Sequence, residues 1–309
     1  MTTDSANLGG VLPVLATPFA PDDRPDADGL RRIAQYVIAA GADGVVYPGV
    51  ASEYDMLTPD ERADLTAVVA AEARGRVALV VGGSAPDEET TKAVAQQARA
   101  LGAAALMVMA PKPLVAVDDV SAFFHRVAVA AAGVPIMLQN APPPAGSGLP
   151  VDVVLAVARA VPQIAYIKEE AMPSGARITQ TLAGAPATLK GVLGGAGGRY
   201  ITDELARGAV GTMPACELTE VHVALMRAHR AGDRARVRHF FNRTLPLLNF
   251  QAVFRMAMTK ETLRRRGIIG HAGKRGPGPE LDAGDHRELG ELLAEVGDLL
   301  DPPVKGSHG

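Results

Sequence analysis

The chain contains eight short apolar runs at a fairly even spacing, and helix-like stretches separate them. The runs cover residues 11–16, 44–48, 77–82, 105–109, 134–139, 164–168, 188–193 and 209–213. Continuous apolar strands that alternate with helices are typical of a parallel sheet with both faces covered. Eight such units within about 215 residues favour a closed (β/α)8 barrel, the TIM-barrel form of the α/β class, over an open doubly wound sheet.

The stretches between the runs have amphipathic patterns that predict helices. They cover 28–41, 58–74, 86–101, 118–132, 150–161, 174–184 and 199–207. Further helices are predicted after the eighth run, at 217–231, 233–245, 248–267 and 286–300. A barrel does not need these last helices, so we expect a C-terminal helical extension. The expected divisions are a flexible N-terminus (1–9), the barrel (10–215), the extension (216–300) and a flexible tail (301–309).

The composition argues against several classes of function. The formal net charge of −3 gives no electrostatic basis for binding nucleic acid or an anionic membrane. The single cysteine, Cys216, excludes an intrachain disulfide and fits a reducing compartment. The sequence shows no metal-ligand spacing, no signal peptide in residues 1–10 and no apolar run of about 20 residues. We therefore expect a cytoplasmic protein without a metal, membrane or nucleic-acid partner.

Lys168 ends the sixth run, so it belongs at the face where the strands' carboxyl ends meet and barrel enzymes carry out their chemistry. Burying an unpaired ammonium is costly, so a lysine there is either solvated or used as an amine nucleophile. The other strand ends are rich in glycine and small polar groups, which suits a pocket where backbone N–H groups approach an anionic ligand. The candidate substrate-binding residues at these ends are Thr17, Tyr47, Ala51, Ser52, Glu53, Gly194, Gly195 and Met213.

Five segments carry a resemblance to a known family. They are VLATPF (14–19), GADGVVYPGVASEYDMLTPDER (41–62), GVPIMLQNAP (133–142), IKEE (167–170) and GAVGTM (208–213). In this order and at predicted strand ends, they resemble the dihydrodipicolinate synthase / N-acetylneuraminate lyase family of class I, Schiff-base-forming enzymes. The resemblance implies that Lys168 forms an imine with the 2-oxo group of pyruvate or of a pyruvate-derived substrate. It also implies a small-molecule 2-oxo acid as the ligand, no cofactor, and a homotetramer.

The chain also departs from the family pattern. Most members have a tyrosine at the end of strand five that relays a proton, whereas this chain has Gln139, which orients ligands but does not titrate usefully. The following loop, 140–146, lacks the arginine that dihydrodipicolinate synthases use for a substrate carboxylate, and Val50 and Ala51 replace two hydroxyl residues. These departures argue against lysine biosynthesis. The remaining pattern, including 194–215, resembles the sugar-acid branch, whose members dehydrate or cleave 2-oxo-3-deoxy sugar acids.

Another group has to move protons if Gln139 cannot. Side chains alternate along a strand, so Lys168 and Glu170 are expected on the same side and Glu169 on the opposite side. We hypothesise that Glu170 acts as acid and base near the imine, with Gln139 as an orienting catalytic residue. The alternative is that Glu170 caps the next helix or pairs with Arg177.

Alternatives also remain for three of the substrate-binding candidates. Ser52 and its backbone N–H are candidate contacts for the substrate carboxylate. Glu53 follows it in a tight turn and either touches the substrate or anchors the loop. Tyr47 either supplies the missing hydroxyl or packs in the core.

Three functions follow from these observations. The favoured one is dehydration of a 2-oxo-3-deoxy sugar acid through a Lys168 imine. The second is a pyruvate-dependent aldolase, which either cleaves its substrate or joins pyruvate to an aldehyde in a biosynthetic pathway. The third is a non-catalytic homologue that binds 2-oxo acids or has a regulatory role, and that has lost proton transfer along with the tyrosine.

Overall fold

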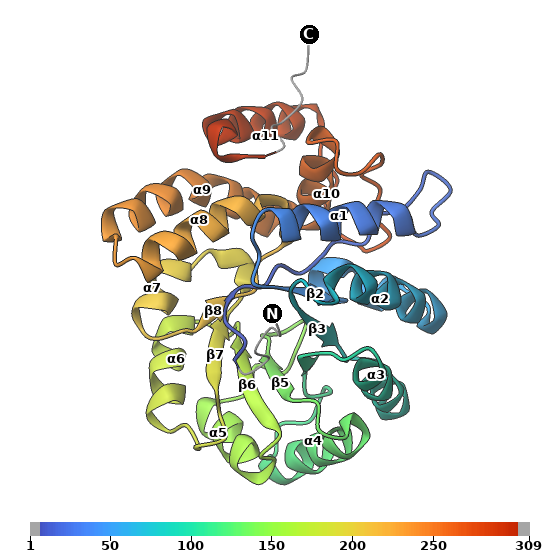
Figure 1. Cartoon of the computed structure of the whole chain (residues 1–309), viewed down its shortest axis with the longest axis vertical. Coiled ribbons are helices and arrows are strands. Elements are labelled where there is room, and N and C mark those ends of the chain that lie inside the picture. The colour runs from blue at the N-terminus through green and yellow to red at the C-terminus, as the bar shows by residue number, and fades with distance from the viewer. Residues whose placement is uncertain (1–6, 302–309) are drawn as a thin grey trace.

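The computed structural model describes residues 7–301 and contains the predicted α/β barrel (Figure 1). Within these residues, eight strands form one parallel sheet in the order β1-β8-β7-β6-β5-β4-β3-β2. The strands are β1 (Gly10–Val11), β2 (Gly44–Tyr47), β3 (Ala78–Gly82), β4 (Ala105–Val108), β5 (Ile136–Asn140), β6 (Ile164–Glu169), β7 (Gly191–Gly194) and β8 (Gly211–Thr212). Every predicted run overlaps one of them, which confirms the fold class.

The two ends of the sheet meet beside residue 14. Val14 forms parallel bridges with Val46 of β2 and with Ala215, which follows β8. The N–H of Leu15 donates to the carbonyl of Val46 at 3.0 Å, so the barrel is nearly closed. The first strand is shorter than the predicted run 11–16 because Pro13 lies inside that run and has no N–H to donate to a ladder.

A ring of helices covers the outside of the barrel. They are α1 (Ala27–Ala39), α2 (Pro59–Ala73), α3 (Glu88–Ala100), α4 (Val117–Ala131), α5 (Val151–Ala160), α6 (Ser174–Ala183) and α7 (Ile201–Ala206). Helix α2 shows how the sequence sets a helix start. The Thr58 hydroxyl accepts from the N–H of Glu61 at 3.2 Å, and the Glu61 carboxylate accepts from the N–H of Thr58 at 3.0 Å, a reciprocal capping box.

Strand alternation divides the apolar side chains into two cores. Val46, Met107 and Met137 belong to a cluster inside the barrel, whereas Ile167 packs in the larger cluster between strands and helices. Burying both faces of the sheet explains why the runs read as continuous apolar sequence rather than as alternating apolar and polar residues. Inward-facing positions near the carboxyl ends of the strands therefore lie at the mouth of the barrel.

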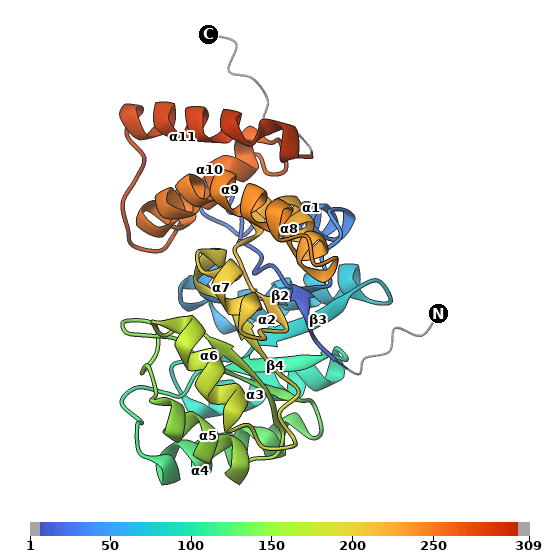
Figure 2. The same ribbon diagram turned by 90° about the vertical axis from the view of Figure 1, so that its left-hand side faces the viewer.

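The C-terminal helices are α8 (Thr219–Arg230), α9 (Arg234–Phe254), α10 (Met256–Arg265) and α11 (Ala283–Glu295). Figure 2 shows α9, α10 and α11 stacked at one end of the molecule, with α11 outermost. The predicted break between 245 and 248 is wrong, because α9 continues through Pro246. The break falls at Arg255, whose φ of 46° cannot continue a right-handed helix.

The described N-terminal residues are packed against the barrel. Leu8 is buried, and its N–H donates to the hydroxyl of Tyr166 at 2.9 Å, which differs from the flexible segment expected for 1–9. Residues 1–6 and most of the expected tail, 302–309, lie outside the described residues. Between residues 7 and 301, no helix combines the length and the apolar character needed to cross a membrane.

Candidate active site

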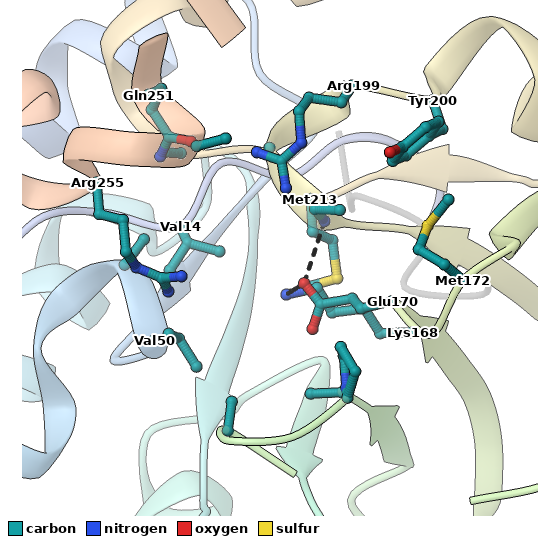
Figure 3. Close-up of a pocket in the computed structure, with 18 of the residues that line it drawn as sticks. Val14, Val50, Lys168, Glu170, Met172, Arg199, Tyr200, Met213, Gln251 and Arg255 are labelled. Carbon is teal, nitrogen blue, oxygen red and sulfur yellow. Dashed lines mark hydrogen bonds and ion pairs between the residues drawn. The ribbon is translucent and has the colours of Figure 1, made fainter. Parts of the chain in front are cut away.

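A cavity of about 280 Å³ opens at the carboxyl ends of the strands (Figure 3). The strand ends contribute Ala51, Lys168, Glu170 and Met213 to its wall, and the loop 141–145 after β5 forms another side. Across the described part of the chain, no group of three or more His, Cys, Asp or Glu side chains is arranged to hold a metal ion. Lys168 and Glu170 are the two charged side chains that the strand ends contribute to the cavity wall.

Lys168 projects into this cavity from β6. Its register partner on β5 is Gln139, and its side chain is only 5% exposed. The Nζ atom lies 3.2 Å from Oε1 of Glu170, so the ammonium is buried with a charged partner rather than solvated. The expectation that Lys168 and Glu170 share one side of the chain is confirmed.

Three groups hold the Glu170 carboxylate. The side-chain amide of Gln139 donates to Oε2 at 2.6 Å, and the N–H of Ala196 donates to Oε1 at 3.2 Å. Burial alone favours the neutral form, but the Lys168 ammonium and these hydrogen bonds outweigh it and hold the pKa of Glu170 below its ordinary value. The resting site therefore contains an ionised carboxylate beside a lysine, which is an arrangement for passing protons.

A model of the Dihydrodipicolinate synthetase family matches residues 7–296, which include every residue of this site. The chain belongs to this family.

Relatives within the family include enzymes with different reactions. The 4-hydroxy-tetrahydrodipicolinate synthase 1 of Streptomyces coelicolor is 32% identical over 313 residues, which cover 96% of this chain and 99% of the relative. The L-2-keto-3-deoxyarabonate dehydratase of Azospirillum brasilense is 29% identical over 300 residues, covering 96% and 95%. Dihydrodipicolinate synthase from Rhodopseudomonas palustris has the same fold, with a TM-score of 0.87 at 24% identity over 93% of this chain and 97% of that chain. The chain is thus a lyase of a family that contains both synthases and dehydratases.

In this family member, Glu169 points away from the cavity. Its carboxylate lies 3.2 Å from Nε of Arg177 and accepts hydrogen bonds from Asn140 and from the N–H of Ala171. Arg177 therefore pairs with Glu169, and the alternative that it pairs with Glu170 is wrong. The pleat of β6 separates the two neighbouring carboxylates into a structural one outside the barrel and one inside it.

Three hydroxyl residues expected to bind substrate are used to hold the turn after β2. The hydroxyls of Thr17 and Tyr47 lie 2.9 Å apart, and Thr17 donates to the carbonyl of Ser52 at 2.6 Å. The Ser52 hydroxyl donates to the carbonyl of Leu15 and accepts from the N–H of Gly49. Burial raises the pKa of Tyr47 well above its ordinary value. These side chains are fully buried and do not line the cavity, so their placement supports a role in holding the turn rather than in touching the substrate.

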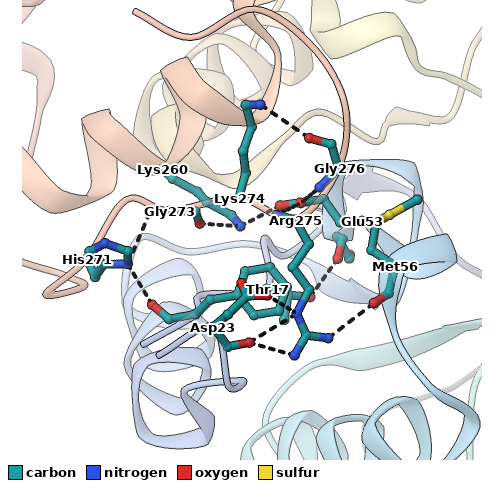
Figure 4. Close-up of polar contacts among 12 residues, drawn as sticks. Thr17, Asp23, Glu53, Met56, Lys260, His271, Gly273, Lys274, Arg275 and Gly276 are labelled. Carbon is teal, nitrogen blue, oxygen red and sulfur yellow. Dashed lines mark hydrogen bonds and ion pairs between the residues drawn. The ribbon is translucent and has the colours of Figure 1, made fainter. Parts of the chain in front are cut away.

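Glu53 anchors the C-terminal segment rather than lining the cavity (Figure 4). It forms a buried ion pair with Lys260 of α10, and its Oε2 accepts from the N–H groups of Arg275 and Gly276 at 2.7 and 2.6 Å. The Lys260 ammonium also lies 4.2 Å from the centroid of the Phe19 ring. Burial lowers the pKa of Lys260, and the Glu53 carboxylate opposes that change. Of the two interpretations of Glu53, the structure supports loop anchoring.

The remaining candidate residues either line the cavity or support it by packing. Ala51 and Met213 line the cavity, as expected for substrate contacts. A Cβ on Gly195 would lie 2.5 Å from Cγ and Oε1 of Glu170, so only glycine leaves room for that carboxylate. Gly194 faces outward, where a Cβ would lie 1.9 Å from a carboxylate oxygen of Glu204. The two glycines support the site by close packing and are not part of the cavity wall.

Sequence reasoning missed a polar wall opposite the strand ends. It consists of Arg199 and Tyr200, which follow β7, and of Gln251 and Arg255 at the end of α9. The first pair follows a strand end, so the rule used for the other candidates would have found it. The second pair lies on helices expected only to extend the barrel, and no local pattern indicates that α9 reaches the cavity.

Proposed function

We propose that the protein is a Schiff-base-forming lyase that dehydrates a 2-oxo-3-deoxy sugar acid. The observation that carries the proposal is the buried pair of Lys168 and Glu170, whose Nζ and Oε1 atoms lie 3.2 Å apart in the cavity. A lysine supplies the amine for an imine, and a carboxylate within hydrogen-bond reach supplies the acid and base that the imine chemistry requires.

In the first stage, the Glu170 carboxylate accepts a proton from the Lys168 ammonium. The neutral amine then adds to C2 of the 2-oxo acid and forms a carbinolamine. Glu170 returns the proton to the carbinolamine hydroxyl, which leaves as water, and an iminium remains between Nζ and C2. The positive iminium nitrogen withdraws electrons and makes the protons on C3 acidic.

In the second stage, Glu170 removes a proton from C3, and the electron pair moves into an enamine. The protonated Glu170 then donates this proton to the hydroxyl on C4, which leaves as water with the C4–O bonding electrons. Hydrolysis of the resulting conjugated iminium releases the product and restores Lys168. Gln139 orients the carboxylate throughout, because its amide donates to Oε2 whether or not Oε1 carries a proton, and it donates more strongly to the ionised form.

Two features favour dehydration over aldol chemistry. One relative, 29% identical over 96% of this chain, is an L-2-keto-3-deoxyarabonate dehydratase. The carboxylate that takes the C3 proton also becomes an acid beside the reacting carbons, and an acid is what the leaving C4 hydroxyl needs. Aldol cleavage instead leaves the C3 proton in place and would require Glu170 to act as a base at the C4 hydroxyl, because Gln139 provides none.

Borohydride reduction in the presence of pyruvate tests the imine, because it converts an iminium into a stable secondary amine. We expect a mass increase on the Lys168 peptide in the wild type and in a Lys92→Met control, which changes a lysine of α3. The Lys168→Met variant is expected to show none. Turnover of 2-oxo-3-deoxy acids should then yield a product with an intact carbon chain. Release of pyruvate would establish an aldolase, and trapping without turnover of any 2-oxo acid would establish a binding protein.

A further inference from the structure

The polar wall of the cavity has an unbalanced charge. Lys168 and Glu170 neutralise each other at 3.2 Å, but the other charged side chains on the wall are Arg199 and Arg255. Neither guanidinium has an ion-pair or hydrogen-bond partner within residues 7–301, although both line the cavity, whereas Arg275 and several other arginines pair with carboxylates. The wall facing the catalytic pair is therefore cationic, with no anion in the described part of the protein to neutralise it.

Both arginines reach this wall from outside the barrel strands. Arg199 follows the turn after β7, and Arg255 lies between α9 and α10. Figure 3 shows both side chains directed into the cavity from the helix side, while Lys168 and Glu170 enter from the barrel side. Gln251, one helical turn before Arg255, lines the same wall and adds a neutral hydrogen-bonding group.

The backbone at Arg255 is an independent observation. Its φ of 46° and ψ of −118° fall in a region that residues with a Cβ rarely adopt. Unfavourable backbone conformations persist where the surrounding structure imposes them, and they concentrate at functional sites. At this position the strained residue turns the chain between two helices and carries its side chain to the cavity.

We propose that Arg199 and Arg255 form a binding site for a second anionic group of the substrate, at the end remote from the 2-oxo acid. The substrate class is then a dianionic 2-oxo acid whose far end carries a carboxylate or a phosphate, groups that guanidinium donors match in charge and geometry. The inference rests on the proposed function, because the Lys168 imine fixes the near end of the substrate. The opposite loop, Ala141–Ala145, has the sequence APPPA and offers no competing side-chain donor.

Two five-carbon acids provide a matched test that needs no turnover. Both 2-oxoglutarate and 2-oxopentanoate present the same 2-oxo acid to Lys168, but only 2-oxoglutarate has a terminal carboxylate. The measured quantity is the concentration of each acid that half-saturates borohydride trapping on the Lys168 peptide. In the wild type, we expect this concentration to be at least about tenfold lower for 2-oxoglutarate, as for a charge-assisted contact. A phosphonate-ended 2-oxobutanoate that traps at still lower concentration would identify phosphate as the natural terminal group, and one that traps at higher concentration would identify carboxylate.

Variants assign the preference to the arginines. In Arg199→Gln/Arg255→Gln, we expect the ratio between the two acids to fall to within about threefold, and Arg255→Gly, which suits the positive φ, to lose part of it. Arg99→Gln, on the exposed face of α3, is the control and should keep the wild-type ratio. A wild-type ratio near one, or an equal loss for both acids in the double variant, would overturn the inference. Failure of every acid to trap on Lys168 would instead overturn the proposed imine, so the two failures are distinguishable.

Discussion

Gln139 donates its side-chain amide to the Glu170 carboxylate at 2.6 Å, across the neighbouring strands β5 and β6. The position that resembles the family's proton-relaying tyrosine therefore contacts the group that we propose to move protons instead. Here Gln139, a fixed donor, supplies orientation, and Glu170, a titrating carboxylate, supplies proton transfer. A single tyrosine hydroxyl can combine both tasks.

Replacing Glu170 by Gln tests its role as acid and base. The amide keeps the size of the side chain but cannot exchange protons, so we expect kcat to fall by about 10²–10⁴-fold. Trapping of pyruvate on Lys168 should persist at long reaction times but form more slowly, because water has to carry the protons that Glu170 moves in the first stage. Glu169→Gln is the matched control, because it alters the carboxylate outside the barrel. We expect it to lower the free energy of unfolding through the loss of the ion pair with Arg177, and to have little effect on kcat. Near-normal turnover of Glu170→Gln would discard the proposed mechanism.

Replacing Gln139 by Met removes a hydrogen bond to the ionised form of Glu170. The pKa of Glu170 is held below its ordinary value by the nearby ammonium and by hydrogen bonds that include this one, so its loss should raise that pKa. Because the proposed mechanism starts from the carboxylate, activity in the variant should decline at a higher pH on the acid side. The measurement is the pH profile of kcat/KM. An acid limb at the wild-type position would show that Gln139 does not tune Glu170.

Replacing Glu53 by Gln leaves the Lys260 ammonium buried without its charged partner. Removing one member of a buried ion pair costs about 3–5 kcal/mol, so we expect a loss of that order in the free energy of unfolding. The double variant Glu53→Gln/Lys260→Met should recover much of it, because an apolar side chain replaces the stranded charge. Urea denaturation measures both. A loss below about 1 kcal/mol in the single variant would contradict the anchoring role.

Glu204 makes stability depend on pH. Burial raises its pKa from 4.5 to about 7, so its contribution to stability is full below pH 4.5 and is lost as the pH rises through 7. Glu204→Gln removes this dependence. We compare the free energy of unfolding of the variant with that of the wild type. As the pH is raised from about 4 to about 8, we expect this difference to shift in favour of the variant by about 3 kcal/mol. Glu291→Gln, on the exposed face of α11, is the control, and an equal change there would argue against Glu204 as the source.

Replacing Arg255 by Gly separates backbone strain from binding. Glycine adopts a positive φ without penalty, so we expect the free energy of unfolding to increase by about 1 kcal/mol. Gln251→Gly, inside α9, is the matched control and should decrease it by a similar amount. Thermal denaturation distinguishes the two signs. A destabilised Arg255→Gly would mean that the guanidinium stabilises the fold.

Local sequence patterns predicted the features that depend on residues close together in the sequence. The apolar runs located the strands, and strand alternation placed Lys168 and Glu170 together. The same rules failed where the decisive partner is distant in sequence. The sequence leaves Glu53 undecided between substrate contact and loop anchor, because its partner Lys260 lies in a helix whose position only tertiary packing sets. Arg255 was missed because a positive φ at a non-glycine residue has no sequence signature.

The origin of the two cavity walls sets an order of events during synthesis. The part of the chain with Lys168 and Glu170 leaves the ribosome well before α9, α10 and the residue that joins them, Arg255. During synthesis, the barrel would thus contain the reactive amine of Lys168 before the wall with Arg255 is present. We propose that this wall selects the substrate. The segment after α10 binds the Glu53 carboxylate through the N–H groups of Arg275 and Gly276. On our proposal, the protein therefore becomes selective for its substrate only when this last part of the chain has packed against the barrel.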